Sequence, residues 1–229
     1  MQARRFFSSA ALAASLVAGA AAAQVAGELT LPGPNDNTWS ATSGRTVGAG
    51  NGLVLGEVGW PGLSIQYSRG LDDKTDLGFK ASFLYGFENT TNSLVGLNLA
   101  VVYKRQLYEN GRLAIAGHID PGLTFYGNRG PDTGNLYGVG APLGAVVGFR
   151  LDDRLTITAG ADIANLISFS NPAGILFGPM VGAGAEFKLD KDLAVTLRTR
   201  FGPEFSIVNG GSNGEFALQT LVGLAYNTR

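Results

Sequence analysis

The chain has 229 residues, a formal net charge of −1, 34 glycines and no cysteine. The length suits one all-β domain, and the near-zero charge gives no electrostatic basis for binding nucleic acid. The absence of cysteine excludes disulfides and thiolate metal sites. Charged residues make up 15% of the chain, which is low beside the roughly 25% that is usual in soluble domains.

The start of the chain has the pattern of an export signal. Arg4 and Arg5 are positively charged, residues 6–22 are apolar and rich in alanine, and residues 21–23 are three alanines that fit a cleavage site. We therefore expect residues 1–23 to be removed after export by the ordinary secretory route. No other stretch reaches 18 consecutive apolar residues, so the sequence predicts no transmembrane helix.

Residues 24–45 are rich in proline, glycine, asparagine, serine and threonine, which is typical of a loose lead-in. After it, bulky apolar residues alternate with small or polar ones in a series of segments. Because side chains on a strand alternate between two faces, this period of two predicts ten β-strands. The segments are residues 47–58, 63–69, 77–87, 95–103, 113–125, 137–151, 155–169, 175–188, 193–207 and 216–226.

The connections between these strands alternate between two kinds. Short, charged turns at residues 71–74, 108–111, 151–154 and 189–192 alternate with connections rich in glycine, asparagine, serine or proline. Short turns at one end and longer loops at the other predict an up-and-down antiparallel arrangement. Eight or twelve strands remain alternatives to ten.

Bulky apolar residues and small or charged residues are divided between the two faces of these strands in the opposite way to that expected in a soluble protein. Between residues 175 and 207 one face carries bulky residues such as Phe177 and Leu197, while the other carries glycines and charges such as Gly182 and Arg198. Glycines would leave holes in a packed core, so we expect a transmembrane β-barrel with its apolar face toward lipid. The alternative is a soluble secreted β-barrel that binds a small apolar ligand inside. That alternative puts the glycines on the solvent face, where they only weaken the strands.

The same alternation predicts which charged side chains line the lumen. Both signs are present, and opposite charges in a narrow lumen are expected to pair because an unpaired buried charge is costly. An ion-paired lumen favours a structural or interaction role, whereas the room left by the glycines favours a narrow channel for small solutes or ions. The predicted lumen residues are Glu57, Lys80, Lys104, Arg112, His118, Asp120, Arg150, Asp162, Glu186, Lys188, Arg198, Arg200 and Glu204.

His118 is the only histidine, and Asp120 lies on the same face two positions further on. A histidine beside a carboxylate can act as a general base, but no recognisable nucleophile motif accompanies this pair. One histidine also does not supply the converging ligands that a metal site needs. We therefore expect polar packing here, with no enzymatic activity, metal or cofactor.

From Val47 to Tyr226 the chain resembles bacterial outer-membrane β-barrel proteins of the small, 8-to-12-strand kind. The resemblance rests on the strand and turn pattern. Residues 223–226 also look similar to the C-terminal aromatic signal of such proteins, displaced by three residues. The resemblance implies a periplasmic lead-in at residues 24–45 and a barrel domain at residues 46–229. It further implies an outer-membrane location, with lipid and the barrel assembly machinery as partners, and a monomer.

Overall fold

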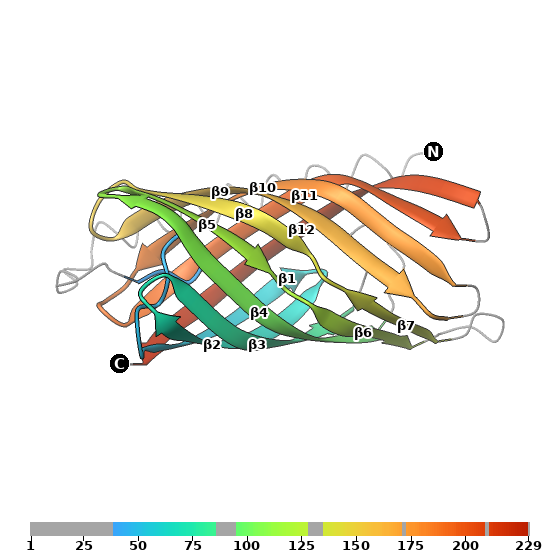
Figure 1. Ribbon diagram of the computed structural model, residues 1–229, viewed down its shortest axis with the longest axis horizontal. Helices are drawn as coiled ribbons and strands as arrows, with labels where there is room; N and C mark the ends of the chain where they lie inside the picture. The colour runs from blue at the N-terminus through green and yellow to red at the C-terminus, as the bar shows by residue number, and fades with distance from the viewer. Residues whose placement is uncertain (1–38, 86–94, 128–134, 171–172, 209–210, 229) are drawn as a thin grey trace. The chain divides into compact units, whose positions relative to one another are not determined.

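The computed structural model describes residues 39–85, 95–127, 135–170, 173–208 and 211–228. Every named element among these residues is a β-strand, and the strands pair antiparallel in one sheet (Figure 1). The expected export signal and most of the expected lead-in lie outside the described residues. Within the described ranges, no helix is long and apolar enough to cross a membrane.

The sheet contains twelve strand segments. Segments β5 and β6 both pair with β4, and segments β7 and β8 both pair with β9, so each of these two pairs forms one interrupted strand. The sheet closes because β12 pairs with β1 and β10 pairs with both β9 and β11, which gives ten antiparallel strands and confirms the predicted barrel. The segments are β1 (Gly52–Trp60), β2 (Gly62–Asp72), β3 (Thr75–Leu84), β4 (Val95–Asn110), β5 (Leu113–Ile119), β6 (Gly122–Gly127), β7 (Leu136–Gly140), β8 (Leu143–Arg150), β9 (Leu155–Ser168), β10 (Gly174–Lys188), β11 (Leu193–Val208) and β12 (Gly211–Thr228).

The sheet turns its apolar face outward on every strand. Phe79 and Ile65 are 67% and 60% exposed, whereas the inward-facing charged residues Glu57 and Lys188 are 4% and 2% exposed. The predicted orientation of the two faces is therefore correct, and the alternative with an apolar face packed inside the barrel is not the arrangement found. The outward side chains contact the medium around the barrel, and the inward side chains form a polar lumen.

Some strand boundaries differ from those predicted. Strand β4 continues to Asn110, so most of the expected turn at residues 108–111 is strand, and a register shift between Gln106 and Tyr108 accompanies the extension. At the other connections the short charged turns lie together at one end of the barrel, the left end in Figure 1, and the strand ends that the remaining connections join lie at the opposite end. These are called the turn end and the loop end below.

Two neighbouring strands are interrupted where prolines stand, at Pro121 and Pro142. A proline lacks an N–H to give to the ladder. The backbone groups around the break still find partners: Asp120 N donates to the carbonyl of Pro142 at 2.9 Å. The side-chain amide of Asn165 takes the place of a missing ladder pair, since it accepts from Ala141 N at 2.7 Å and donates to Ala141 O at 2.8 Å. The wall is thus closed across the break by a side chain.

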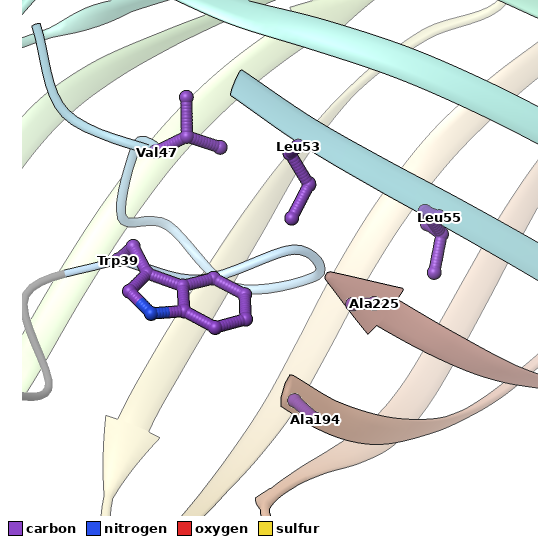
Figure 2. Close-up of a cluster of buried hydrophobic side chains, with 6 residues drawn as sticks. All are labelled: Trp39, Val47, Leu53, Leu55, Ala194 and Ala225. Carbon is purple, nitrogen blue, oxygen red and sulfur yellow. The ribbon is translucent and has the colours of Figure 1, made fainter. Parts of the chain in front are cut away.

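Residues 39–47, which we call the inner segment, lie inside the turn end of the barrel. Trp39 and Val47 are each 1% exposed and pack against inward-facing residues of β1, β11 and β12. Figure 2 shows this cluster, which joins the two ends of the inner segment to the wall. Its members are Trp39, Val47, Leu53, Leu55, Ala194 and Ala225. The described part of the expected lead-in therefore lies inside the barrel.

Candidate functional site

The inner segment is held by one buried carboxylate of the wall. Oε2 of Glu186, on β10, accepts hydrogen bonds from the Ser40 hydroxyl at 2.8 Å and from the backbone N–H of Ala41 at 2.9 Å. It also accepts from the backbone N–H and the hydroxyl of Thr42 at 3.1 and 3.2 Å. Charge-assisted bonds of this kind are stronger than neutral ones. Glu186 is 1% exposed, so the segment replaces the water that the carboxylate would otherwise need.

Lys188 forms a second anchor next to Glu186. Its Nζ lies 3.3 Å from Glu186 Oε1, donates to the carbonyl of Trp39 at 2.9 Å and lies over the Trp39 ring. Trp39 in turn donates its ring N–H to the carbonyl of Lys191 at 2.7 Å. The start of the inner segment is therefore fixed to the wall by a cation–π contact and two hydrogen bonds, beside an ion pair between two residues of β10.

A third anchor holds the end of the inner segment from the opposite side. Lys104, on β4, pairs with Asp76, on β3, at 3.1 Å and donates to the carbonyls of Ser40 and Arg45 at 3.2 and 2.6 Å. Asp76 accepts from Val47 N at 3.1 Å. With these contacts the inner segment is bound to β3, β4 and β10 together inside the turn end of the barrel.

Above the inner segment, Glu57 is the centre of an ion-paired group. Arg198 binds its carboxylate in a bidentate manner, with Nε at 2.8 Å from Oε1 and an Nη2 contact of 2.7 Å to Oε2. Lys80 lies 3.6 Å from the same carboxylate, and the Ser64 hydroxyl donates to it at 3.2 Å. The side chain of Glu57 is 1% exposed. The group links β1, β2, β3 and β11 through the lumen.

A second group of charged residues is formed by β5, β9 and β11. His118 Nε2, on β5, lies 2.8 Å from Asp162 Oδ1, on β9, and Arg200, on β11, lies 3.8 Å from Asp162 Oδ2. His118 Nδ1 lies 3.9 Å from Asp120 Oδ1, which is beyond hydrogen-bond distance. The predicted pairing of inward charges is therefore present, and it ties strands that are not neighbours in the sheet.

Inward-facing glycines make these long-range pairs possible. Gly144, on β8, stands in register between His118 and Asp162, and a Cβ at Gly144 would lie 2.1 Å from Asp162 Oδ1. Gly223, on β12, stands in the same way between Glu57 and Thr196, and a Cβ there would lie 2.9 Å from Glu57 Cγ. Because glycine has no side chain, a charged group on one neighbouring strand can extend across the glycine to a group on the strand beyond it.

We predict that Gly144→Ala lowers the free energy of unfolding by about 1–3 kcal/mol, the usual cost of inserting a methyl group where there is no room. The new Cβ would also meet the carbonyl oxygen of Ala161 at 2.5 Å, so the wall itself has to shift. The urea midpoint of the protein folded into lipid measures the loss. Gly117→Ala is the matched control because its Cβ would have no neighbour closer than 3.8 Å. Equal midpoints for the two variants would contradict the role assigned to Gly144.

Between the inner segment and the loop end, the lumen contains a cavity of about 350 Å³. Its floor includes Ala41, Thr42 and Ser43 of the inner segment, and both ion-paired groups contribute side chains to its wall. Toward the loop end the lining includes the apolar residues Pro61, Leu84, Tyr126, Leu166 and Leu176 beside polar ones such as Asn165 and Glu204. The candidate site is therefore a cavity with polar and apolar lining residues that the inner segment borders at the turn end.

The structure distributes the predicted lumen residues over three places. Those that line the cavity are Lys80, Lys104, His118, Asp120, Asp162, Arg198, Arg200 and Glu204. Glu57, Glu186 and Lys188 are buried in the ion-paired group and in the anchors of the inner segment. Arg150 ends β8 at the turn end, half-buried and outside the cavity lining.

The prediction for Arg112 is wrong. Arg112 lies in the turn before β5 and is exposed, because the strand that carries the inward alternation begins only at Leu113. Sequence reasoning also missed Asp76 and the whole inner segment. Asp76 shares the face of Lys80 by its even spacing, which could have revealed it. Nothing in the composition of residues 39–47 distinguishes a segment inside the lumen from a loose one.

Comparisons with known proteins add little to this picture. No family model matches the chain, and no curated protein matches it in sequence. Among solved structures, the chain is similar to a deltaS2 mutant of the TodX monoaromatic hydrocarbon channel, at 11% identity over 82% of this chain and 93% of that one. The TM-score is 0.37, a level at which the likeness carries no argument. In the described part of the chain, no group of three or more His, Cys, Asp or Glu side chains could hold a metal ion.

Proposed function

We propose that this protein is an integral β-barrel of a bacterial outer membrane, closed at its turn end by the inner segment, with a structural or interaction role in the envelope. The observation that carries the proposal is the outward face, on which large apolar side chains are exposed on every strand. Soluble monomers rarely expose apolar patches beyond a few hundred Å². In a bilayer the same face is solvated by lipid, and the paired charges of the lumen are kept away from it.

The backbone supports the same proposal. A bilayer core offers no water to unpaired N–H and C=O groups, so only helices and closed barrels are stable there. The sheet closes on itself, and Asn165 satisfies Ala141 where the ladder is interrupted. The proposal includes lipid and the barrel assembly machinery as partners, an N-terminal export signal and a monomeric state, and it assigns no reaction to the lumen.

A second candidate is a narrow channel for small solutes, which is favoured by the cavity above the inner segment. Gel mobility of the unheated protein in detergent, together with conductance in a planar bilayer, separates the two. The first proposal expects a heat-modifiable species without conductance steps, because the inner segment fills the turn end. Discrete steps from the unaltered chain would favour the channel. A soluble folded protein with no heat-modifiable species would contradict both.

A further inference from the structure

We propose that an anionic phospholipid of the leaflet at the turn end binds to the outer face of β2, β3 and β4, with its phosphate between Arg69 and Arg105. The inference rests on the proposed function, because it takes the outward face of the barrel to be in contact with lipid. Within the described strands, these two are the basic side chains that face outward, and both are exposed. The other lysines and arginines of the strands face inward.

The two arginines occupy the same place in a pattern of outward side chains that occurs twice. Each follows an outward tyrosine by two positions and precedes an exposed leucine by two positions. The triplets are Tyr67, Arg69 and Leu71 on β2, and Tyr103, Arg105 and Leu107 on β4. The leucines are 58% and 66% exposed, so apolar side chains lie on both sides of each arginine along its strand. A charge placed in this way in a bilayer is costly unless it reaches a headgroup, and the long arginine side chain allows that.

The stagger of the strands brings the two arginines to one level. Strand β12 extends well past the end of β1 at the loop end, so a line of constant height moves toward the turn end by about one residue at each strand from β1 onward. Across the ladder, Arg69 lies opposite Leu77, which lies opposite Tyr103. Arg105 is two positions nearer the turn end and two strands away, at the height of Arg69. Strand spacing and rise put their Cα atoms about 12 Å apart, so both guanidinium groups can reach one phosphate over β3.

The donors of both arginines are available to a group outside the protein. In the described part of the chain, neither arginine forms an ion pair. Arg105 lies beside the Tyr103 hydroxyl, and the carboxylate of Asp72 acts on it only from beyond ion-pair distance. Asp72 itself accepts a hydrogen bond from Lys74 N at 2.7 Å. Because guanidinium groups bind phosphate oxygens in a bidentate manner, a lipid phosphate is a fitting partner at this place.

The wall next to the arginines offers a surface for an acyl chain. Strands β2, β3 and β4 lie side by side there (Figure 1). On the loop side of the arginines, Phe79 is 67% exposed and stands in register between Tyr67 and Val101. Leu77, 37% exposed, lies between this row and the turn end. A lipid with its phosphate at the arginines therefore has an apolar wall beside its chains, which a soluble phosphate compound cannot use.

Native mass spectrometry of the barrel refolded in detergent tests this proposal, because it counts bound lipids directly. Phosphatidylglycerol should bind about tenfold more tightly than phosphatidylcholine with the same acyl chains, since each exposed charge pair adds a few-fold and two act on one phosphate. The compound sn-glycerol 3-phosphate, which has no acyl chains, should not displace the lipid. Equal binding of the two lipids, or displacement by glycerol phosphate, would overturn the proposal.

Variants locate the site. Arg69→Gln combined with Arg105→Gln should abolish the preference for phosphatidylglycerol. Arg112→Gln combined with Lys191→Gln removes the same charge from two exposed turn positions and should retain it. Equal loss in both double variants would mean attraction to the net charge and would refute the assigned position.

Gel mobility and the urea midpoint in phosphatidylcholine show beforehand whether each variant is folded like the parent. A folded parent barrel without a preference for phosphatidylglycerol refutes the lipid site alone. A chain that never forms a heat-modifiable species refutes the proposed function.

Discussion

Replacing Glu186 with alanine should release the inner segment from the lumen while the strands of the barrel stay paired. The change removes the acceptor of four hydrogen bonds from Ser40, Ala41 and Thr42. It also leaves Lys188, which is 2% exposed, without its carboxylate. Removing one partner of a buried ion pair typically costs about 3–5 kcal/mol because the remaining charge is uncompensated. Departure of the segment admits water to Lys188 and relieves that cost, so the segment and not the wall gives way.

Labelling of a single introduced cysteine measures this release, since the chain has no native cysteine. Val47 is 1% exposed, and Val47→Cys keeps a small apolar group at the position. A bulky maleimide should react slowly with Val47→Cys in the otherwise unaltered barrel. We expect labelling at least tenfold faster in the Glu186→Ala background, together with conductance steps in a planar bilayer.

Glu109→Ala is the matched control. Glu109 also pairs with the inner segment, through Arg45 at 3.0 Å, but its side chain is 40% exposed. Water reaches the Glu109 end of this pair, and Arg45 keeps its hydrogen bond to the carbonyl of Gly111, so this variant should label nearly as slowly as the parent. If Glu186→Ala also remains protected while the barrel is folded, the segment is held by the apolar cluster around Trp39 and not by the carboxylate.

The strands and their faces could be predicted from the sequence because both depend on local spacing. Alternation such as Phe177 against Gly178 determines which face each residue takes, whatever the distant partners are. The pairing of inward charges could also be predicted, because opposite charges in a narrow lumen have few partners other than one another. The interrupted strands were not predicted, although Pro121 and Pro142 stand within the expected segments, where proline argues against a continuous ladder.

The inner segment could not be predicted, for a different physical reason. Its stability comes from groups such as Glu186, Lys104 and Asp76, which lie on three strands far apart in the sequence. Serine, threonine and glycine at residues 40–46 are equally typical of a surface loop, because they make hydrogen bonds to water or to protein with similar ease. Only the closed barrel distinguishes an inner segment from a surface loop, because the buried charges at its turn end need the hydrogen bonds that the segment provides.

Arg198→Leu should destabilise the barrel by about 3 kcal/mol, a loss that is read from the urea midpoint in lipid. Arg198 supplies two of the contacts that compensate Glu57, whose side chain is 1% exposed. Lys80, at 3.6 Å, and the Ser64 hydroxyl remain but cannot replace a bidentate guanidinium. The expected loss is therefore at the lower end of the range of about 3–5 kcal/mol for a broken buried pair.

The double variant Arg198→Leu with Glu57→Gln decides whether the cost comes from the unpaired charge. Neutralising Glu57 removes the charge that Arg198 compensated, so the double variant should recover more than half of the loss and the two changes should not add. Arg69→Leu, at an exposed position of β2, is the control and should shift the midpoint little. Strict additivity in this cycle would mean that Arg198 stabilises the barrel through its packing in the lumen, and that the ion pair with Glu57 contributes nothing measurable.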